Sequence, residues 1–199
     1  MHISFNRRRI LVAGGSRGIG RSIALGFAAA GADVAICARG LERLRQTEAE
    51  LRNLGASVHA SACDLADGDA VTAWVDGAAE ALGGIDVLVN NASGFARSDD
   101  EAGWGTSIDV DLMASVRASR AALPWLEENG GSIVHIASIS GLAPSVRTPA
   151  YGAAKAALIQ YTMTQASALA GRRIRVNCVA PGSIDFPGGV WDEARRRDP

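Results

Sequence analysis

The alternation of short β-branched runs with longer Ala- and Leu-rich stretches is the feature that most constrains the fold of this chain. Strands that alternate with helices in this way predict βαβ units joined into a parallel sheet. The runs are nearly continuous in apolar residues, which is typical of strands covered by helices on both faces. The strands we expect are residues 9–13, 34–38, 57–62, 86–90, 132–137 and 174–179. The sequence therefore predicts an α/β fold, a doubly wound parallel sheet in one domain over residues 1–199.

The segments between these runs have apolar residues at the spacing of an α-helix. In one interval, four leucines between Leu41 and Leu54 give the stretch an apolar face. The helices we expect are residues 19–30, 41–54, 68–82, 104–127 and 151–170. Residues 98–105 are polar and contain glycine, so they predict a loop.

Composition and charge exclude several classes of protein. A net charge of −1 gives no overall attraction to nucleic acid or to a membrane, and we interpret two short arginine runs, 7–9 and 195–197, as solvated charge. No apolar run approaches the roughly 20 residues that span a bilayer. Cys37, Cys63 and Cys178 are too scattered for a disulfide framework or a metal site, so they predict buried, reduced thiols. We expect a cytoplasmic protein with no metal, nucleic-acid or membrane partner.

A glycine-rich loop follows the first strand and opens the first helix. Glycines there let the backbone approach a pyrophosphate, and the helix N-terminus offers free N–H groups and its positive dipole end. The spacing Gly-x-x-x-Gly-x-Gly differs from the common dinucleotide fingerprint, so a tight structural turn is the alternative. The strand–loop–helix context favours a Rossmann-type dinucleotide site. The residues of this loop are Gly14, Gly15, Ser16, Arg17, Gly18, Ile19 and Gly20.

The residue after the second strand predicts which dinucleotide binds. NAD sites usually place an acid there for the ribose 2′-hydroxyl, but this chain has Arg39. A guanidinium matches a 2′-phosphate bidentately, whereas a carboxylate would repel it. Arg17 could supply a second cation. The alternative is that Arg39 is a solvated residue at a helix start, but the two arginines together favour NADP(H).

Tyr151 and Lys155 are four residues apart, so they stack on one face of a predicted helix. A free tyrosine has a pKa of about 10. A cation one turn away favours the phenolate and lowers that pKa. Ser138 follows the fifth strand, at the sheet edge where ligands collect in open α/β folds. Its hydroxyl could hold a substrate carbonyl beside the phenol. Taken singly, Tyr151 is more typical of a packed aromatic, Lys155 of a solvated charge, and Ser138 of a loop or cap residue.

The combination resembles the classical short-chain dehydrogenase/reductase family over nearly the whole chain, in particular its 3-oxoacyl-[acyl-carrier-protein] reductases. The glycine loop is similar to the cofactor motif of that family. The segment from Asn90 to Gly94 resembles its Asn-Asn-Ala-Gly motif, and Ser138 lies thirteen residues before Tyr151, as in that family. Asp64 and Leu65 match its adenine-contacting position. The Pro-Gly turn and the nicotinamide contact after it correspond to Pro181, Gly182 and Ile184.

The resemblance implies a mechanism and a cofactor. Tyr151 would be the general acid in reduction and the general base in oxidation. Lys155 would lower the pKa of Tyr151 and bind the nicotinamide ribose, and Ser138 would orient the substrate oxygen. Asn91 and the loop residues would contact NADP(H). The family also implies a homodimer or homotetramer and a ketone or secondary alcohol as substrate, with a 3-oxoacyl thioester as the narrower expectation.

Four departures from the family pattern affect this expectation. Ala13 stands where the family usually has Thr, Ser93 replaces a Gly, and Phe186 replaces a Thr that often bonds the nicotinamide amide. Asp111 falls where the family carries a catalytic Asn. An aspartate accepts hydrogen bonds but cannot donate unless protonated, and its charge would tend to hold Lys155 protonated. We therefore include Asp111 as a fourth catalytic candidate.

The family usually continues beyond the Pro-Gly turn into a substrate lid, another helix and a seventh strand, whereas the sequence stops at Asp198 and Pro199. We interpret the chain as a shortened piece of such a protein rather than a natural short form. Two further hypotheses stay open: an NADP-binding regulatory or assembly module without turnover, and an epimerase or dehydratase of the extended subfamily, which the glycine spacing and length fit less well.

Overall fold

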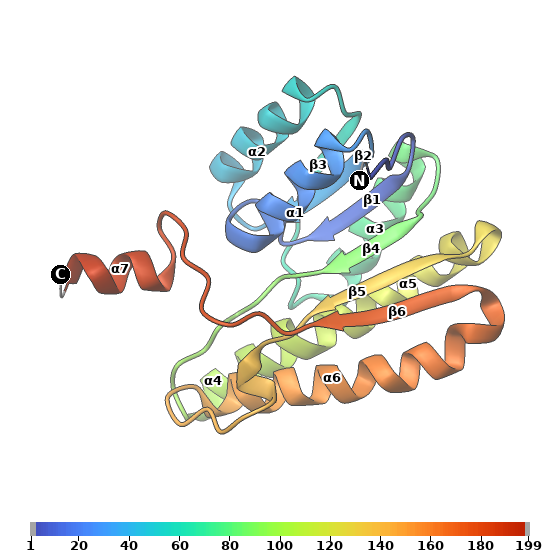
Figure 1. The fold of residues 1–199 in the computed structure, drawn as a ribbon. Helices are drawn as coiled ribbons and strands as arrows, with labels where there is room; N and C mark the ends of the chain where they lie inside the picture. Colours follow the sequence, from blue (N-terminus) through green and yellow to red (C-terminus); the bar gives the residue numbers. More distant parts are fainter. Residues whose placement is uncertain (1–2, 198–199) are drawn as a thin grey trace.

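The computed structural model describes residues 3–197, which form a single parallel sheet with helices packed around it (Figure 1). The strand order is β3-β2-β1-β4-β5-β6. Neighbouring strands are parallel throughout, so all their carboxyl ends lie at one edge. This confirms the Rossmann-type doubly wound sheet. The strands are β1 (Arg9–Ala13), β2 (Asp33–Ala38), β3 (Val58–Ala62), β4 (Val87–Asn90), β5 (Gly131–Ile136) and β6 (Ile174–Val179).

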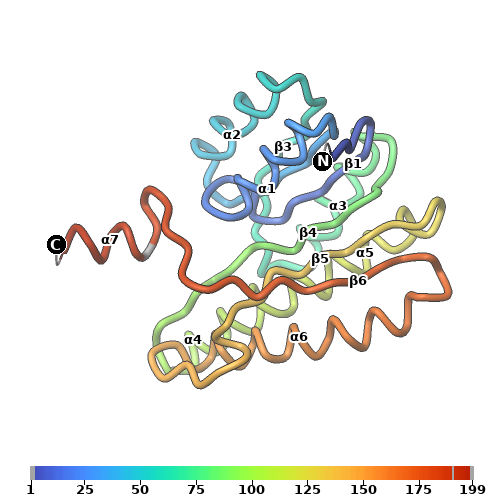
Figure 2. The backbone as a smooth tube through the Cα atoms, viewed as in Figure 1, coloured from blue at the N-terminus to red at the C-terminus, as the bar shows by residue number. Residues whose placement is uncertain are grey.

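The helices divide between the two faces of the sheet. One apolar cluster joins the sheet to α1 and α2, and the other joins it to α3, α5 and the end of α6. The tube in Figure 2 traces the same two layers and shows α7 projecting away from the sheet. The helices are α1 (Gly18–Ala29), α2 (Leu41–Asn53), α3 (Gly68–Leu82), α4 (Glu101–Thr106), α5 (Ala114–Asn129), α6 (Pro149–Leu169) and α7 (Val190–Arg197).

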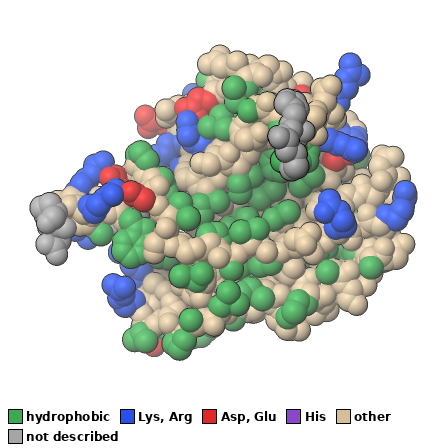
Figure 3. Space-filling model, viewed as in Figure 1, with side chains coloured by type: hydrophobic (Ala, Val, Ile, Leu, Met, Phe, Trp, Pro, Cys, Tyr) green, Lys and Arg blue, Asp and Glu red, His purple; other side chains and the backbone are tan. Residues whose placement is uncertain are grey.

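Apolar side chains remain exposed where β5 and β6 end. Ile139, Val179 and Ile184 are each about half exposed, at 51%, 50% and 44%. Figure 3 shows apolar side chains gathered across the face of the molecule on which these strands lie. Cys178 on β6 is accordingly only half-buried, so the prediction of buried thiols is confirmed for Cys37 and Cys63 and wrong for Cys178.

The segment before α5 differs most from the sequence prediction. The loop predicted over 98–105 is wrong from Glu101 onward, because Asp100 caps a helix there by accepting the backbone N–H of Gly103 at 2.8 Å. The helix predicted over 104–127 is interrupted by a π-helical stretch, Ser107–Met113, and extends to Asn129. π-Helical turns inside helices frequently occur at functional sites, and Asp111 lies within this one. Asp198 and Pro199 lie outside the described residues.

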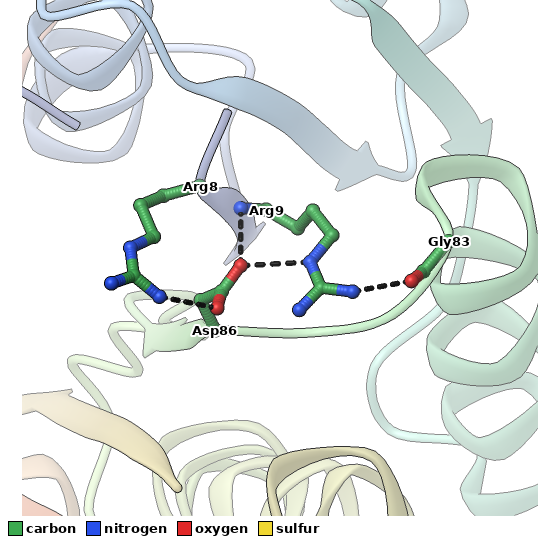
Figure 4. Close-up of polar contacts among 4 residues, drawn as sticks. All are labelled: Arg8, Arg9, Gly83 and Asp86. Atoms are coloured by element: carbon green, nitrogen blue, oxygen red, sulfur yellow. Dashed lines mark hydrogen bonds and ion pairs between the residues drawn. The ribbon is translucent and has the colours of Figure 1, made fainter. Parts of the chain in front are cut away.

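A buried carboxylate fixes the amino-terminal edge of the sheet (Figure 4). Asp86, which is 6% exposed, accepts hydrogen bonds from Arg8 Nη1 at 3.0 Å, Arg9 Nε at 2.8 Å and the Arg9 backbone N–H at 2.9 Å. Arg9 also donates to the Gly83 carbonyl. Burial acts to raise the pKa of Asp86, but the hydrogen bonds from the two arginines outweigh it and the pKa is lowered.

We expect Asp86→Asn to destabilise the fold by about 2 kcal/mol at pH 7, the scale of hydrogen bonds to a charged group. Because the folded-state pKa is depressed, this stability is present above the unfolded-state pKa and lost as pH falls through the folded-state pKa. Urea unfolding at pH 7 and at successively lower pH should show the two proteins converging. Glu80→Gln on the exposed face of α3 is the matched control. A difference that stays constant down to acid pH would contradict this account.

Candidate active site

The glycine loop is held by backbone contacts at the carboxyl ends of β1, β2 and β4. The N–H groups of Gly14 and Gly15 both donate to the Cys37 carbonyl at 3.1 Å, and Asn91 Nδ2 donates to the Gly14 carbonyl at 2.9 Å. Gly14 has a φ of +77°, and a Cβ there would lie 2.8 Å from the Ala92 Cα. A side chain at Gly14 would therefore strain the backbone and push the loop away from β4.

A cavity of about 420 Å³ opens at this edge of the sheet. It brings together most of the residues predicted to bind the cofactor, from the ends of β1, β2, β3 and β4. Its lining includes Gly14, Ser16, Arg17, Gly18, Ile19, Arg39, Asp64, Leu65 and Asn91. The loop glycines pack so closely against neighbouring residues that a Cβ at Gly14, Gly15 or Gly20 would clash, and α1 begins at the loop without a side-chain cap. The loop backbone and the start of α1 therefore fit a dinucleotide pyrophosphate.

The other predicted cofactor residues lie outside this cavity. Gly20 packs against the Gly14 carbonyl and the Asn91 side chain, so it holds the loop close rather than lining the space. Pro181, Gly182 and Ile184 follow β6, where the Pro181 carbonyl accepts the Ile139 N–H at 3.1 Å. Tyr151 and Lys155 belong to a cluster next to the cavity.

The cavity lining also holds residues that the sequence analysis did not assign to the cofactor, among them Arg43 and Phe186. Arg43 lies on the first turn of α2 and lines the cavity together with Arg39. The two arginines are four residues apart, and this spacing could have indicated that Arg43 lies near the cavity. Phe186 lies over the glycine loop, since a Cβ at Gly18 would be 2.7 Å from the Phe186 Cζ. The sequence carries no signal for this placement of Phe186.

A buried polar cluster lies beside the cavity, between β5 and α6. Lys155, with a side chain 3% exposed, donates to the Ile136 carbonyl at 3.0 Å and places Nζ 5.6 Å from the Tyr151 ring centroid. Tyr151 is buried on the first turn of α6. Ser138 lies two residues beyond β5, where it caps a short 3₁₀ turn by accepting the Ser140 N–H at 3.1 Å. The structure therefore brings the three predicted groups to one place.

Asp111 completes this cluster from the π-helical stretch. It is fully buried, with Oδ2 accepting the Gly94 N–H at 3.2 Å and Oδ1 lying 3.4 Å from Lys155 Nζ. The contact between Lys155 Nζ and Asp111 Oδ1 is an ion pair without hydrogen-bond geometry. Oδ1 therefore has no hydrogen-bond partner within the part of the chain described. Val110 lines the cavity directly before Asp111, so the π-helical stretch joins the cavity to the cluster.

Burial dominates the acid–base properties of the cluster. It raises the pKa of Tyr151, the Ser138 side chain acts to lower it, and the Asp111 charge raises it further. Burial also lowers the pKa of Lys155, although Asp111 acts to raise it. The expectation that Lys155 lowers the pKa of Tyr151 is therefore wrong for this structure. The physical reason is that the phenol is desolvated and a carboxylate lies close to the ammonium.

A second aromatic side chain contacts the candidate tyrosine. The ring of Phe95 meets the ring of Tyr151 edge-on at 4.9 Å, and the Arg97 guanidinium lies 5.6 Å from the Phe95 centroid. Phe95 has a φ of +46°, which is rare for a bulky residue. Strain of this kind concentrates at functional sites, and nothing in the sequence pattern indicated it.

Comparison with known proteins gives the family. The family described as short chain dehydrogenase matches residues 8–196 of the chain. The chain belongs to this family. One relative, (2S)-[(R)-hydroxy(phenyl)methyl]succinyl-CoA dehydrogenase subunit BbsD of Thauera aromatica, is 36% identical over 201 residues, covering 98% of this chain and 80% of BbsD. The chain is thus an oxidoreductase by family, and its relatives are dehydrogenases and reductases.

Two solved structures share the fold of this chain. A short chain dehydrogenase from Burkholderia cenocepacia J2315, in complex with NADP, has a TM-score of 0.88 and 40% identity, covering 96% of this chain and 82% of that chain. An NAD⁺-bound xylitol dehydrogenase has a TM-score of 0.89 and 30% identity, covering 96% of this chain and 75% of that chain. The family thus binds either nicotinamide dinucleotide. In residues 3–197, no helix has the length and apolarity needed to cross a membrane.

We expect the Tyr151 phenol to titrate above the usual pKa of a tyrosine, and Asp111→Asn to lower that pKa by removing a nearby negative charge. The chain has two tyrosines, so a Tyr161→Phe background leaves Tyr151 as the phenol observed in an ultraviolet titration. Asp109→Asn on the same π-helical stretch is the matched control, because Asp109 is half exposed and lies 3.7 Å from Arg117. Equal titration curves for all three proteins would contradict the proposed electrostatic role of Asp111.

Proposed function

We propose that the chain is an NADP(H)-dependent oxidoreductase that interconverts a ketone and a secondary alcohol, with Tyr151 as the general acid and base. The observation that carries this proposal is the buried cluster of Ser138, Tyr151 and Lys155 directly beside a glycine-lined cavity of dinucleotide character. A bound nicotinamide cofactor supplies or accepts the hydride. The residues of the chain then have to move one proton and orient one oxygen.

Tyr151 performs the proton transfer in this proposal. In reduction its hydroxyl donates a proton to the carbonyl oxygen, and in oxidation the phenolate accepts the proton of the alcohol. The raised pKa of Tyr151 favours the protonated phenol, which is the form that reduction requires. The Ser138 hydroxyl donates a hydrogen bond to the same substrate oxygen, and it already acts to lower the pKa of the phenol.

Lys155 and Asp111 keep this tyrosine in position and hold charge near it. Lys155 is fixed by the Ile136 carbonyl and by the neighbouring carboxylate, so its ammonium stays at one distance from the Tyr151 ring. Asp111 Oδ1 lies 3.4 Å from Lys155 Nζ, so its carboxylate holds negative charge next to the ammonium. This supports Asp111 as a fourth member of the site in the place where the family carries an asparagine.

NADP(H) is proposed over NAD(H) because of the charge around the cavity. Arg17 and Arg39 line it, and Asp64 is its one carboxylate among the described lining residues. A 2′-phosphate is stabilised by guanidinium groups, whereas a ribose 2′-hydroxyl gains little from them. The NADP complex of the Burkholderia relative is consistent with this choice.

A 3-oxoacyl thioester is the substrate we propose to test first. The BbsD relative acts, by its name, on a succinyl-coenzyme A derivative, so thioester substrates occur close to this chain. The half-exposed Ile139, Val179 and Ile184 offer apolar contacts for an acyl chain at the end of β5 and β6. We further propose one domain over residues 1–199, a homodimer or homotetramer, and a cytoplasmic location.

We expect NADPH absorbance to fall with acetoacetyl-coenzyme A or a simple diketone, and Tyr151→Phe to slow this by about a hundredfold or more, the scale of lost general acid catalysis. NADH in parallel reports the cofactor preference. Tyr161→Phe is the matched control, because Tyr161 lies on the same helix and bonds Gln165 rather than the cluster. If NADPH binds but is not oxidised in the presence of any ketone, the proposed ketone reductase activity is contradicted. That result would favour an NADP-binding module without turnover.

A further inference from the structure

A chain of hydrogen-bonded polar side chains lies buried between the sheet and α6. Asn90 and His135 are paired residues on the neighbouring strands β4 and β5, with Asn90 Nδ2 3.2 Å from His135 Nδ1. His135 Nε2 lies 2.9 Å from Gln165 Oε1 on α6. All three residues are at most 7% exposed. These contacts therefore join two strands to α6 in a region where water does not compete for the same groups.

The two amides determine which imidazole nitrogen of His135 carries the proton. An amide nitrogen donates and an amide oxygen accepts, so Nδ1 accepts from Asn90 and Nε2 donates to Gln165. Burial lowers the pKa of His135, Gln165 acts to raise it, and the charge of Lys155 acts to lower it. His135 is therefore a neutral imidazole with both nitrogens bonded, and the Lys155 ammonium lies close enough to affect it.

Each strand residue of this network is followed by a residue that holds part of the candidate site. His135 directly precedes Ile136, whose carbonyl accepts a hydrogen bond from the Lys155 ammonium at 3.0 Å. Asn90 directly precedes Asn91, whose side chain donates to the glycine loop at 2.9 Å. The network thus lies next to the attachment of Lys155 and next to the attachment of the glycine loop.

Apolar packing alone does not set the rotation of α6 about its own axis. Apolar residues are spread around this helix, so it has no single apolar face that would turn toward the sheet. Gln165 bonds β5 at His135. Lys155, ten residues earlier on α6, bonds the same strand at Ile136. Two bonds at separate points fix the rotation of the helix, and Tyr151 lies one turn before Lys155, so its ring turns with the helix.

We propose that His135 and Gln165 are positioning residues that set the rotation of α6 on the sheet and thereby hold Lys155 and Tyr151 in the active site. For its kinetic readout this inference rests on the proposed function. The placement of Lys155 can also be measured without turnover, because Lys155 is the single lysine of the chain.

The first test is the rate of reductive methylation of Lys155 by formaldehyde and a borane reductant, read by mass mapping of its peptide. In the unaltered protein the side chain is 3% exposed and hydrogen-bonded, so it should react slowly. We expect Gln165→Met, which keeps the side-chain volume but removes the bond to His135, to speed this methylation about tenfold, the scale of one lost hydrogen bond. His135→Phe should have the same effect, and Gln165→Met alone decides if that variant does not fold.

Thr162→Val is the matched control. Thr162 is 5% exposed on α6, and its hydroxyl donates to the Leu158 carbonyl at 2.8 Å within the helix. The change removes a buried hydrogen bond of α6 without altering a contact with β5, so Lys155 should stay protected. Tyr161→Phe should also leave the rate unchanged within twofold, because Tyr161 accepts a hydrogen bond from Gln165 Nε2 and its loss leaves Gln165 Oε1 on His135.

The second test is ketone-dependent NADPH oxidation. We expect Gln165→Met to lower kcat about tenfold or more, with the KM of the ketone and the Kd of NADPH changed less than twofold, because misplacement of Tyr151 affects proton transfer rather than binding. The variant that combines His135→Phe with Gln165→Met should be no slower than the slower single variant, since both changes remove the same bond.

The outcomes separate this inference from the proposed function. If the unaltered protein oxidises NADPH with no ketone, the proposed function is wrong, and the methylation rates alone decide the role of His135 and Gln165. If Lys155 is as protected in Gln165→Met as in Thr162→Val, the positioning role is overturned. A combined variant whose loss of kcat is the product of the two single losses would also overturn it, because the two residues would then act independently.

Discussion

The parallel register of the sheet is the constraint on which the rest of the molecule depends. Because neighbouring strands run in the same direction, the segments that follow them meet at one edge. The glycine loop follows β1, Arg39 follows β2, Asn91 follows β4 and Ser138 lies just beyond β5. Residues far apart in the sequence thus form one cavity and one buried cluster.

In the buried cluster, desolvation has a larger effect on the pKa of Lys155 than the attraction between Lys155 and Asp111. An ammonium and a carboxylate 3.4 Å apart lie almost entirely out of solvent. Taking both from water costs several kcal/mol, which their attraction has to offset. The pKa of Lys155 is still lowered, so desolvation exceeds the stabilisation that Asp111 provides. A phenol placed beside this pair is held protonated, and a cofactor or substrate that adds positive charge would shift it.

Much of this arrangement could be predicted from the sequence because its signals are local. Apolar runs predict strands, and Gly14 predicts a tight turn in which a side chain would not fit. The four-residue spacing of Tyr151 and Lys155 predicts that both lie on the same face of one helix. The start of α4 was missed because the Asp100 cap competes with two glycines in a polar segment. The pKa of Tyr151 was predicted in the wrong direction because burial depends on tertiary packing, which spacing does not report.

We propose that the cavity and the Tyr151 cluster are parts of one active site, joined through Val110 and Asp111, although Tyr151 does not line the cavity itself. The most direct test is an ultraviolet titration of Tyr151 in the Tyr161→Phe background, with and without saturating NADP⁺. A cationic nicotinamide bound next to the cluster should lower the pKa of Tyr151 by favouring the phenolate. Binding of NADP⁺ that leaves the titration of Tyr151 unchanged would show that the two are separate and contradict the account.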